Sequence, residues 1–184
     1  MKHIEITTAK RSDAEILCNI FINHITEHPE YISHGEIQMG VGEGTYVPSD
    51  KSGAGGFISK PSPFAREKWM NYINGKFDTL ETSSIFKATV ISSGSLEVEE
   101  IAGFCVLEIT DDGDAPFGML CDVLVKEEYR GKGIGTKLIQ KSMEWFRSKG
   151  IKDIYLESGL GNHAAHAYFE RLGFHQVSHI FKLE

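Results

Sequence analysis

The sequence predicts a protein of the α/β (α+β) class, with residues 1–184 forming a single domain. Strand-like and helix-like hydrophobic patterns alternate along the chain. A length of 184 residues is sufficient to bury one sizeable core. The composition, 41% hydrophobic and 24% charged, is typical of a globular protein rather than a disordered one.

Charge, cysteine content and hydropathy limit the classes of partner. The formal net charge of −7 opposes binding to nucleic acid through its phosphates. The three cysteines form no C-x-x-C pair, which predicts reduced thiols and a cytoplasmic location. No apolar run approaches the ~18 residues of a membrane-spanning helix, so no membrane partner is expected.

The first part of the chain predicts a strand, a helix and a long insertion. Residues 3–9 alternate like a strand, and apolar residues then recur at helical spacing until Pro29. Residues 30–63 are rich in glycine and proline and are expected to form a loop. Aromatic side chains in and beside this insertion suggest a lid over a bound ligand; packing on the surface or at a dimer contact is the alternative. They are Tyr31, Tyr46, Phe57 and Phe64.

The middle of the chain predicts a helix followed by three strands. Residues 64–75 have a helical pattern, and residues 84–92 and 98–109 are expected to form a β-hairpin. Residues 118–125 (GMLCDVLV) are almost continuously apolar, as in a central buried strand.

The C-terminal part predicts two helices, each followed by a strand. The first helix ends near residue 149, where Gly150 is a suitable stop. The pattern then predicts a strand over 151–158, a helix over 163–172 and a last strand over 174–183.

A glycine-rich stretch, EEYRGKGIGTKL (127–138), lies between the buried strand and the next helix. A helix N-terminus offers free N–H groups and the positive end of the helix dipole. Gly131, Gly133 and Gly135, between and beside Arg130 and Lys132, remove every other side chain from a backbone that a diphosphate can then approach. A turn alone requires fewer glycines. The stretch matches neither the dinucleotide fingerprint nor the P-loop pattern, and we interpret it as a phosphate cradle.

These residues resemble the GNAT superfamily of N-acetyltransferases. RGKGIG (130–135) is similar to the R/Q-x-x-G-x-G/A signature of that family, and GNHAAHAYFERLGF (161–174) is similar to its second signature. The resemblance covers the chain outside residues 30–63. It implies a mixed, mostly antiparallel sheet of six or seven strands flanked by about four helices. The central parallel strands, 118–125 and 151–158, are expected to splay and admit the cofactor.

The resemblance also implies the reaction. Acetyl-CoA is the expected acyl-donor cosubstrate, and a primary amine of a small molecule or a peptide is the expected acceptor. The alternative is a catalytically inactive acyl-CoA-binding regulatory module. Either a monomer or a homodimer is compatible with the family. The positions that match its cofactor-binding residues are Val123, Val125, Arg130, Gly131, Lys132, Gly133, Gly135, Thr136, Asn162 and Phe169.

Acetyl transfer requires a neutral amine, an oxyanion binder and a proton for the departing thiolate. The resemblance assigns the oxyanion contact to the backbone N–H of Val123. Where the family often has a tyrosine that protonates the thiolate, this chain has Phe169, and Tyr168 lies one position earlier. One residue along a helix is a rotation of ~100°, so Tyr168 is not expected to inherit that role directly.

The general base also departs from the family. Met119 stands where some members have a glutamate, and Asp122 is the nearest acidic candidate. Asp122 is interpreted as a structural carboxylate, as a base, or as an anchor for the amine. Glu157 is a further candidate near the end of the partner strand.

One pattern suggests a metal site. HITEH (24–28) matches the H-x-x-E-H pattern of zinc peptidases. The sequence shows no third ligand for it, and we predict no metal.

Overall fold

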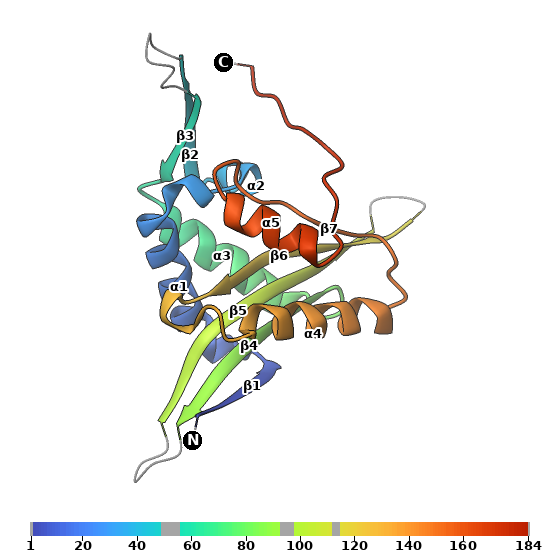
Figure 1. Cartoon of the computed structure of the whole chain (residues 1–184). Coiled ribbons are helices and arrows are strands. Elements are labelled where there is room, and N and C mark those ends of the chain that lie inside the picture. Colours follow the sequence, from blue (N-terminus) through green and yellow to red (C-terminus); the bar gives the residue numbers. More distant parts are fainter. Residues whose placement is uncertain (1, 49–55, 93–97, 112–114, 184) are drawn as a thin grey trace.

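The computed structural model describes residues 2–48, 56–92, 98–111 and 115–183 (Figure 1). Its main sheet has five strands in the order β1-β4-β5-β6-β7. These are β1 (Lys2–Thr8), β4 (Ser83–Ser92), β5 (Val98–Thr110), β6 (Phe117–Val125) and β7 (Ile154–Leu156). The first four strands pair antiparallel, and β7 pairs parallel with β6. The mixed, mostly antiparallel sheet is therefore confirmed.

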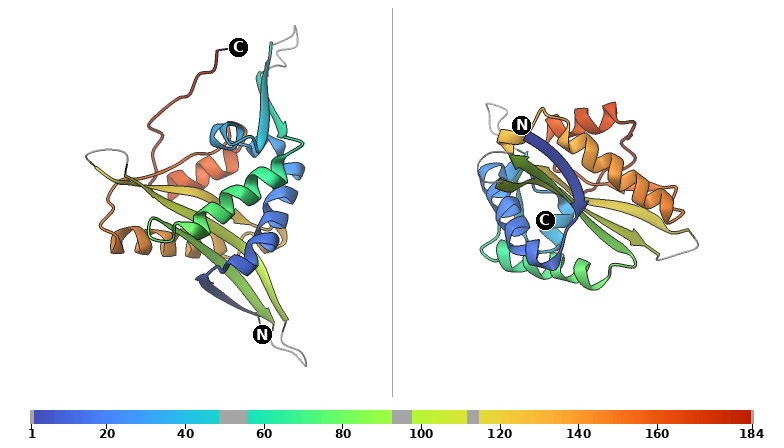
Figure 2. Two further views of the ribbon diagram at one scale, coloured as in Figure 1. Left: turned by 180° about the vertical axis from the view of Figure 1, so that it is seen from behind. Right: turned by 90° about the horizontal axis from the view of Figure 1, so that it is seen from below.

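Helices cover both faces of this sheet (Figures 1 and 2). On one face, α1 (Ala14–Glu27) and α3 (Ala65–Asp78) enclose a core that includes Trp69 and Phe104. On the other face, α4 (Ile134–Ser148) packs on a second core, with α5 (His163–Arg171) against its edge. The shorter helices are η1 (Arg11–Asp13), η2 (Pro29–Tyr31), α2 (His34–Gln38) and η3 (Glu127–Tyr129).

The α4 face shows how the sequence fixes this packing. The side chains of Leu138 and Phe146 are completely buried against the sheet. The Phe146 ring lies 2.5 Å from the place that a Cβ of Gly118 would occupy. Only glycine at this position of β6 allows the ring to lie so close to the strand. Full burial of such a side chain contributes about 1.5–3 kcal/mol.

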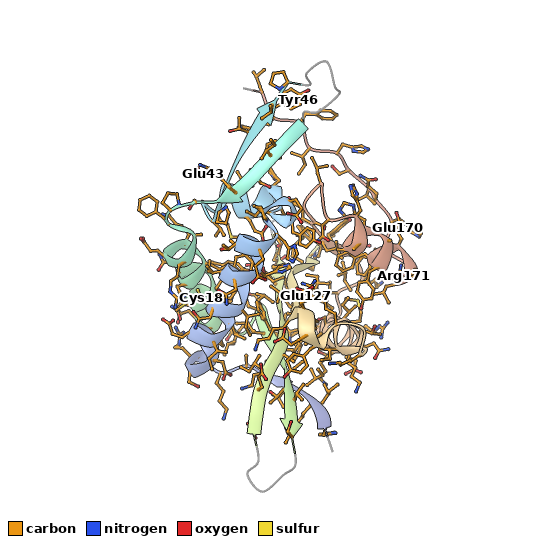
Figure 3. All side chains as sticks on the ribbon, turned by 60° about the vertical axis from the view of Figure 1, so that its left-hand side comes forward. Cys18, Glu43, Tyr46, Glu127, Glu170 and Arg171 are labelled. Atoms are coloured by element: carbon orange, nitrogen blue, oxygen red, sulfur yellow. The ribbon has the colours of Figure 1, made fainter. Side chains whose placement is uncertain are left out.

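The described residues of this insertion, 30–48 and 56–63, are not the loop that their glycines and prolines suggested, and residues 49–55 lie outside the described part of the chain. The described residues contain the end of η2, α2 and a separate two-stranded ribbon of β2 (Gly42–Val47) and β3 (Gly56–Pro61). The ribbon projects beyond the helices and carries Glu43 and Tyr46 (Figure 3). Gly44 permits the cross-strand packing, because the Phe57 ring lies 2.2 Å from the place of its missing Cβ. Gly44 therefore serves packing within a strand. The sequence analysis had interpreted the glycines of this insertion as the sign of a loop.

The C-terminal strand predicted over 174–183 was wrong, since these residues form no strand in the structure. Apolar alternation does not by itself provide a hydrogen-bonding neighbour, and Val177, Phe181 and Leu183 are 75%, 92% and 96% exposed. The strand predicted over 151–158 is shorter than expected, because only Ile154–Leu156 pair with β6. The main sheet consequently has five described strands rather than six or seven.

Within the described residues, every helix is too short or too polar to cross a membrane.

Candidate functional site

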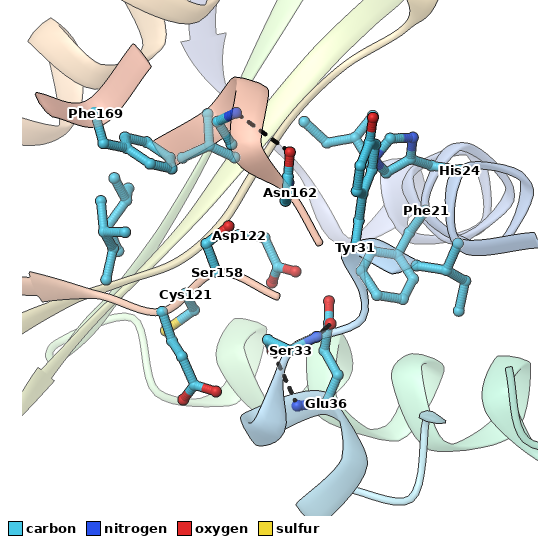
Figure 4. A pocket seen from close by; sticks show the side chains of 17 residues that line it. Phe21, His24, Tyr31, Ser33, Glu36, Cys121, Asp122, Ser158, Asn162 and Phe169 are labelled. Atoms are coloured by element: carbon cyan, nitrogen blue, oxygen red, sulfur yellow. Dashed lines mark hydrogen bonds between the residues drawn. The ribbon is translucent and has the colours of Figure 1, made fainter. Parts of the chain in front are cut away.

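A pocket opens where β6 and β7 part (Figure 4). Parallel pairing of the two strands stops at Leu120 opposite Leu156. Residues 122–125 of β6 continue to pair with β5 but have no β7 partner. The walls of the pocket come from α1, η2, α2, β6, the segment after β7, and α5. The expected splaying of the two central strands is thus present.

A β-bulge in β6 sets the direction of the side chains at this opening. Val106 of β5 lies opposite Asp122, whereas the next residue, Leu107, lies opposite Leu120. Cys121 is therefore the additional residue of the bulge. It packs against the core on the α1 and α3 face, and Asp122 also reaches α3. Bulges of this kind re-aim side chains next to functional sites.

Asp122 is a partly buried carboxylate with a defined partner. Tyr72 Oη on α3 donates a hydrogen bond to Asp122 Oδ2 at 2.9 Å. Burial raises the pKa of Asp122 to about 6, while the Tyr72 hydrogen bond and the charge of Lys76 act in the opposite direction. The indole N–H of Trp69 lowers this pKa slightly, although it makes no regular hydrogen bond within the described structure.

Glu36 is a second carboxylate in the pocket, and sequence reasoning missed it. It lies on α2, where its Oε2 accepts a hydrogen bond from the Ser33 N–H at 2.5 Å. Ser33 Oγ accepts in return from the Glu36 N–H at 3.3 Å, which completes a capping box. Burial raises the pKa of Glu36 to about 7, and the charge of Asp122 adds to this effect. The S-x-x-E pattern of residues 33–36 was the available signal.

Two further ionisable residues, His24 and Glu157, line the pocket. The Nη2 group of Arg130 lies 3.4 Å from Nδ1 of His24, and the guanidinium is the donor. Burial, followed by the charge of Arg130, lowers the pKa of His24 to about 4, so this imidazole is neutral at pH 7. Glu157, the third acidic candidate from the sequence, accepts a hydrogen bond from the Gly35 N–H at 2.9 Å.

The glycine stretch lies directly before and within the first turn of α4. Gly131 and Gly133 have φ angles of 73° and 75°, and no atom lies within 4 Å of where their Cβ atoms would be. No side chain within the described structure caps the N-terminus of α4. Gly135 has a different role, because its missing Cβ would lie 3.3 Å from the Tyr168 hydroxyl. Bare backbone with open space beside it fits the expected phosphate cradle.

The basic side chains beside these glycines turn back toward the preceding segment. Arg130 Nε donates to the Val125 carbonyl at 3.1 Å. Lys132 Nζ donates to the Glu128 carbonyl at 2.7 Å, and it lies 5.1 Å from the centre of the Tyr129 ring. These hydrogen bonds hold the guanidinium of Arg130 and the ammonium of Lys132 against the preceding segment. The space beside Gly131 and Gly133 remains open.

Helix α5 places its two adjacent aromatic residues differently. Phe169 lines the pocket together with Val123. The Tyr168 hydroxyl instead lies 3.1 Å from Thr136 Oγ1, on the first turn of α4. Asn162 begins α5, where its Oδ1 accepts from the Ala165 N–H at 3.3 Å, and it also lines the pocket.

The predicted site residues therefore form two neighbouring groups joined by β6. Asp122, Val123, Asn162 and Phe169 lie at the pocket, whereas Gly131, Gly133, Gly135, Thr136 and Tyr168 lie around the start of α4. Val125, between the two groups, packs against the core on the α4 face. Backbone N–H groups at one end can hold an anion, and carboxylates at the other can hold a cation.

The aromatic lid is only partly in position. Of its four proposed residues, Tyr31 lines the pocket, and its ring stacks on His28 at 4.8 Å. Phe57 lines a separate hollow with Leu160 instead. The rings of the HITEH histidines, His24 and His28, are tilted against each other with their centres 5.3 Å apart, and no group of three or more potential metal ligands occurs within the described residues.

Comparison with known proteins gives consistent matches. The sequence profile of the acetyltransferase (GNAT) family matches residues 63–174. N-alpha-acetyltransferase 30 of Schizosaccharomyces pombe is 37% identical over 65 residues, which are 35% of this chain and 43% of that protein. Aminoglycoside N(6')-acetyltransferase type 1 of Acinetobacter genomosp. 13 is 30% identical over 66 residues, 36% of this chain and 45% of that protein. Both matches span less than half of the relative's length.

Solved structures share the fold across nearly the whole chain. Aminoglycoside N-acetyltransferase AAC(6')-Iy, solved in complex with CoA, superposes with a TM-score of 0.65 at 12% identity, covering 100% of this chain and 95% of that one. A predicted acetyltransferase from Clostridium acetobutylicum, solved with acetyl-CoA, has a TM-score of 0.62 at 15% identity, covering 99% and 96%. At these identities the likeness concerns the fold alone.

Proposed function

This chain belongs to the GNAT family of acetyltransferases, and from that premise we propose that it transfers the acetyl group of acetyl-CoA to a primary amine. The observation that carries the proposal is the position of an uncapped helix N-terminus beside a pocket that contains carboxylates. The first feature suits the diphosphate of the donor, and the second suits a cationic acceptor.

The residues present fit acetyl-CoA as the cosubstrate. Gly131 and Gly133 leave open space over the first N–H groups of α4, where a pyrophosphate is favoured. Residues 121–125 of β6 lack a β7 partner, which leaves room for the pantetheine arm along this edge. We assign the stabilisation of the developing oxyanion to the backbone N–H of Val123. Bound acetyl-CoA supplies the thioester that the amine attacks.

The pocket favours an acceptor with a positive charge. Asp122, Glu36 and Glu157 contribute three carboxylates, and the described lining contains no lysine or arginine. His24 does not offset this charge, because its pKa of about 4 keeps it neutral. The names of the relatives include an N-alpha-acetyltransferase and an aminoglycoside N(6')-acetyltransferase. Both small-molecule and peptide amines therefore remain candidate acceptors.

One observation favours the alternative of an inactive acyl-CoA-binding module. Phe169 lies at the pocket and has no proton to donate to a thiolate. The Tyr168 hydroxyl is engaged at Thr136 on α4. In an active enzyme, the thiolate must then receive its proton from water or from the amine nitrogen.

The three free cysteines are consistent with a reducing compartment. We accordingly propose that the protein acts in the cytoplasm, as a monomer or a homodimer.

The experiment measures free thiol released from acetyl-CoA with three probe amines: 1,4-diaminobutane, kanamycin and a tetrapeptide with a free N-terminus. We expect amine-dependent release with at least one of these probes. Calorimetry with acetyl-CoA accompanies the assay. Binding of acetyl-CoA without release of thiol by any probe would favour the inactive module, and absence of binding would contradict both candidate functions.

A further inference from the structure

We propose that Glu36 is the catalytic proton acceptor for the incoming amine and that Asp122 holds the ammonium group in place. The two carboxylates come from α2 and β6, and they divide between them the roles of base and anchor, which the sequence left as alternatives for Asp122. This inference rests on the proposed acetyl transfer.

The geometry places both carboxylates in the same part of the pocket. Figure 4 shows Asp122 and Glu36 directed into a common space from opposite walls. The capping box holds Glu36 in this direction, because Oε2 is bound to the Ser33 N–H and the Ser33 hydroxyl holds the Glu36 N–H. The side chain is thereby positioned at the N-terminus of α2 before any ligand binds.

Other ionisable groups of the pocket are less suited to accept the proton. His24 has a pKa of about 4 and would release the proton again at once. Burial raises the pKa of the Cys121 thiol to about 12, so it carries no negative charge at pH 7. Glu157 lies 3.8 Å from Nδ1 of His34 through the same oxygen, Oε1, that accepts from the Gly35 N–H, so it is directed toward α2.

Asp122 is better suited to remain ionised. The Tyr72 hydroxyl donates to it, and the positive charge of Lys76 favours its anionic form. Its pKa of about 6 lies below the value of about 7 for Glu36. The hydroxyl donor and the cation that favour a charged carboxylate thus belong to Asp122, whereas no cation within the described structure acts on Glu36, and this is an arrangement that separates an anchor from a base.

The proton balance of the transfer is as follows. The bound ammonium gives one proton to Glu36 and becomes a neutral amine. Its lone pair forms the new C–N bond at the thioester carbonyl, and the C–S bond breaks with its electron pair on sulfur. The nitrogen then loses a second proton, which neutralises the thiolate by way of water, and Glu36 returns its proton to solvent.

The pH dependence involves every ionisable group that faces Glu36. α5 adds only Asn162, Ala165 and Phe169, none of which titrates. The titratable groups are His24 of α1, Tyr31 of η2, Cys121 and Asp122 of β6 with its α3 partners Tyr72 and Lys76, and Glu157 after β7.

The kinetic test compares Glu36→Gln, Asp122→Asn and a control, with the probe amine that gives turnover. Glutamine preserves the capping box, so α2 remains intact. We expect Glu36→Gln to lower kcat about 100-fold and to remove the rise in activity with pH near 7. Asp122→Asn should raise KM for the amine. The rise in activity with pH should persist in this variant but occur at a lower pH, because the Asp122 charge, which adds to the raised pKa of Glu36, is gone. Glu144→Gln, on an exposed side chain of α4, is the matched control.

A second readout does not depend on turnover. Carbon NMR of the labelled carboxyl groups should show Glu36 titrating near pH 7 in the wild type and at lower pH in Asp122→Asn. Two results would overturn the catalytic assignment of Glu36 and leave the proposed acetyl transfer standing. One is titration of Glu36 in the ordinary range of a glutamate, and the other is an unchanged pH profile in an active Glu36→Gln variant. A wild type that acetylates none of the probes would overturn the proposed function, and the catalytic assignment with it.

Discussion

The glycine stretch before α4 and the acidic pocket are both reached from β6, but they are built in different ways. The glycine stretch uses the backbone of consecutive residues, and its important side chains are those that are missing at Gly131 and Gly133. The pocket uses side chains from separate elements, such as Glu36 on α2 and Asp122 on β6. The first is a property of one segment, and the second exists only when several segments have packed together.

The electrostatic difference follows from the same construction. A helix N-terminus has a fixed partial charge that does not depend on pH. The carboxylates of the pocket titrate, and burial has raised the pKa values of Asp122 and Glu36 toward neutrality. Changes of pH should therefore affect the pocket strongly and the glycine stretch little.

The largest expected effect concerns stability, and it belongs to the pocket. Because the pKa of Asp122 rises from 3.8 to about 6, the folded protein binds this proton more tightly than the unfolded chain does. The stabilisation is complete below the ordinary pKa and is lost as pH rises through about 6, at a cost of about 3 kcal/mol. Urea unfolding at pH 4, 6 and 8 should show Asp122→Asn gaining stability relative to the wild type as pH rises.

The control for this experiment is the same pH series on Gly133→Val. We expect its difference from the wild type to be independent of pH, since neither glycine nor valine at position 133 adds or removes a titrating side chain. A difference between Asp122→Asn and the wild type that stayed constant from pH 4 to pH 8 would contradict the raised pKa.

The second effect belongs to the glycine stretch. Gly133→Val places a β-branched side chain at a φ of 75° and on the open side of the α4 N-terminus. We expect acetyl-CoA affinity to fall at least tenfold, which is about 1.4 kcal/mol. Isothermal calorimetry measures this change directly.

Gly150→Val provides the matched control for that change. Gly150 has a φ of 76° and the same open surroundings, but it follows the C-terminal end of α4. The two variants carry the same backbone strain, so only Gly133→Val should lose affinity. Equal losses in both would mean that strain, rather than contact with the diphosphate, is responsible.

The smallest effect is expected where the two regions meet, at Tyr168. Tyr168→Phe removes one hydrogen bond to Thr136, worth about 1 kcal/mol of stability. Turnover should change by no more than about twofold, and Phe169→Tyr should keep or raise it. Steady-state kinetics at saturating acetyl-CoA provides the measurement. If Tyr168→Phe alone abolished turnover while acetyl-CoA still bound, Tyr168 would be the general acid and the comparison of the two aromatic positions would be wrong.

Features that depend on residues close together in the chain were predictable from the sequence. The apolar run of β6, the glycines before α4 and the amphipathic pattern of α4 were all predicted in place, because each reflects residues a few positions apart. Asp122 was identified as an acidic residue within an apolar strand, and the helix predicted over 163–172 corresponds to α5. The mixed sheet and its central parallel pair followed from the family resemblance.

The contacts between distant side chains, in contrast, follow from the packing of the elements. The bulge at Cys121 turns Asp122 toward Tyr72, and no local pattern in β6 announces that change of register. Glu36 has its capping box written in the sequence, but its place opposite Asp122 depends on where α2 docks. Residues 174–183 alternate like a strand and form none. Periodicity describes what a segment can bury, whereas pairing, burial and charge coupling depend on the neighbour that the fold brings to it.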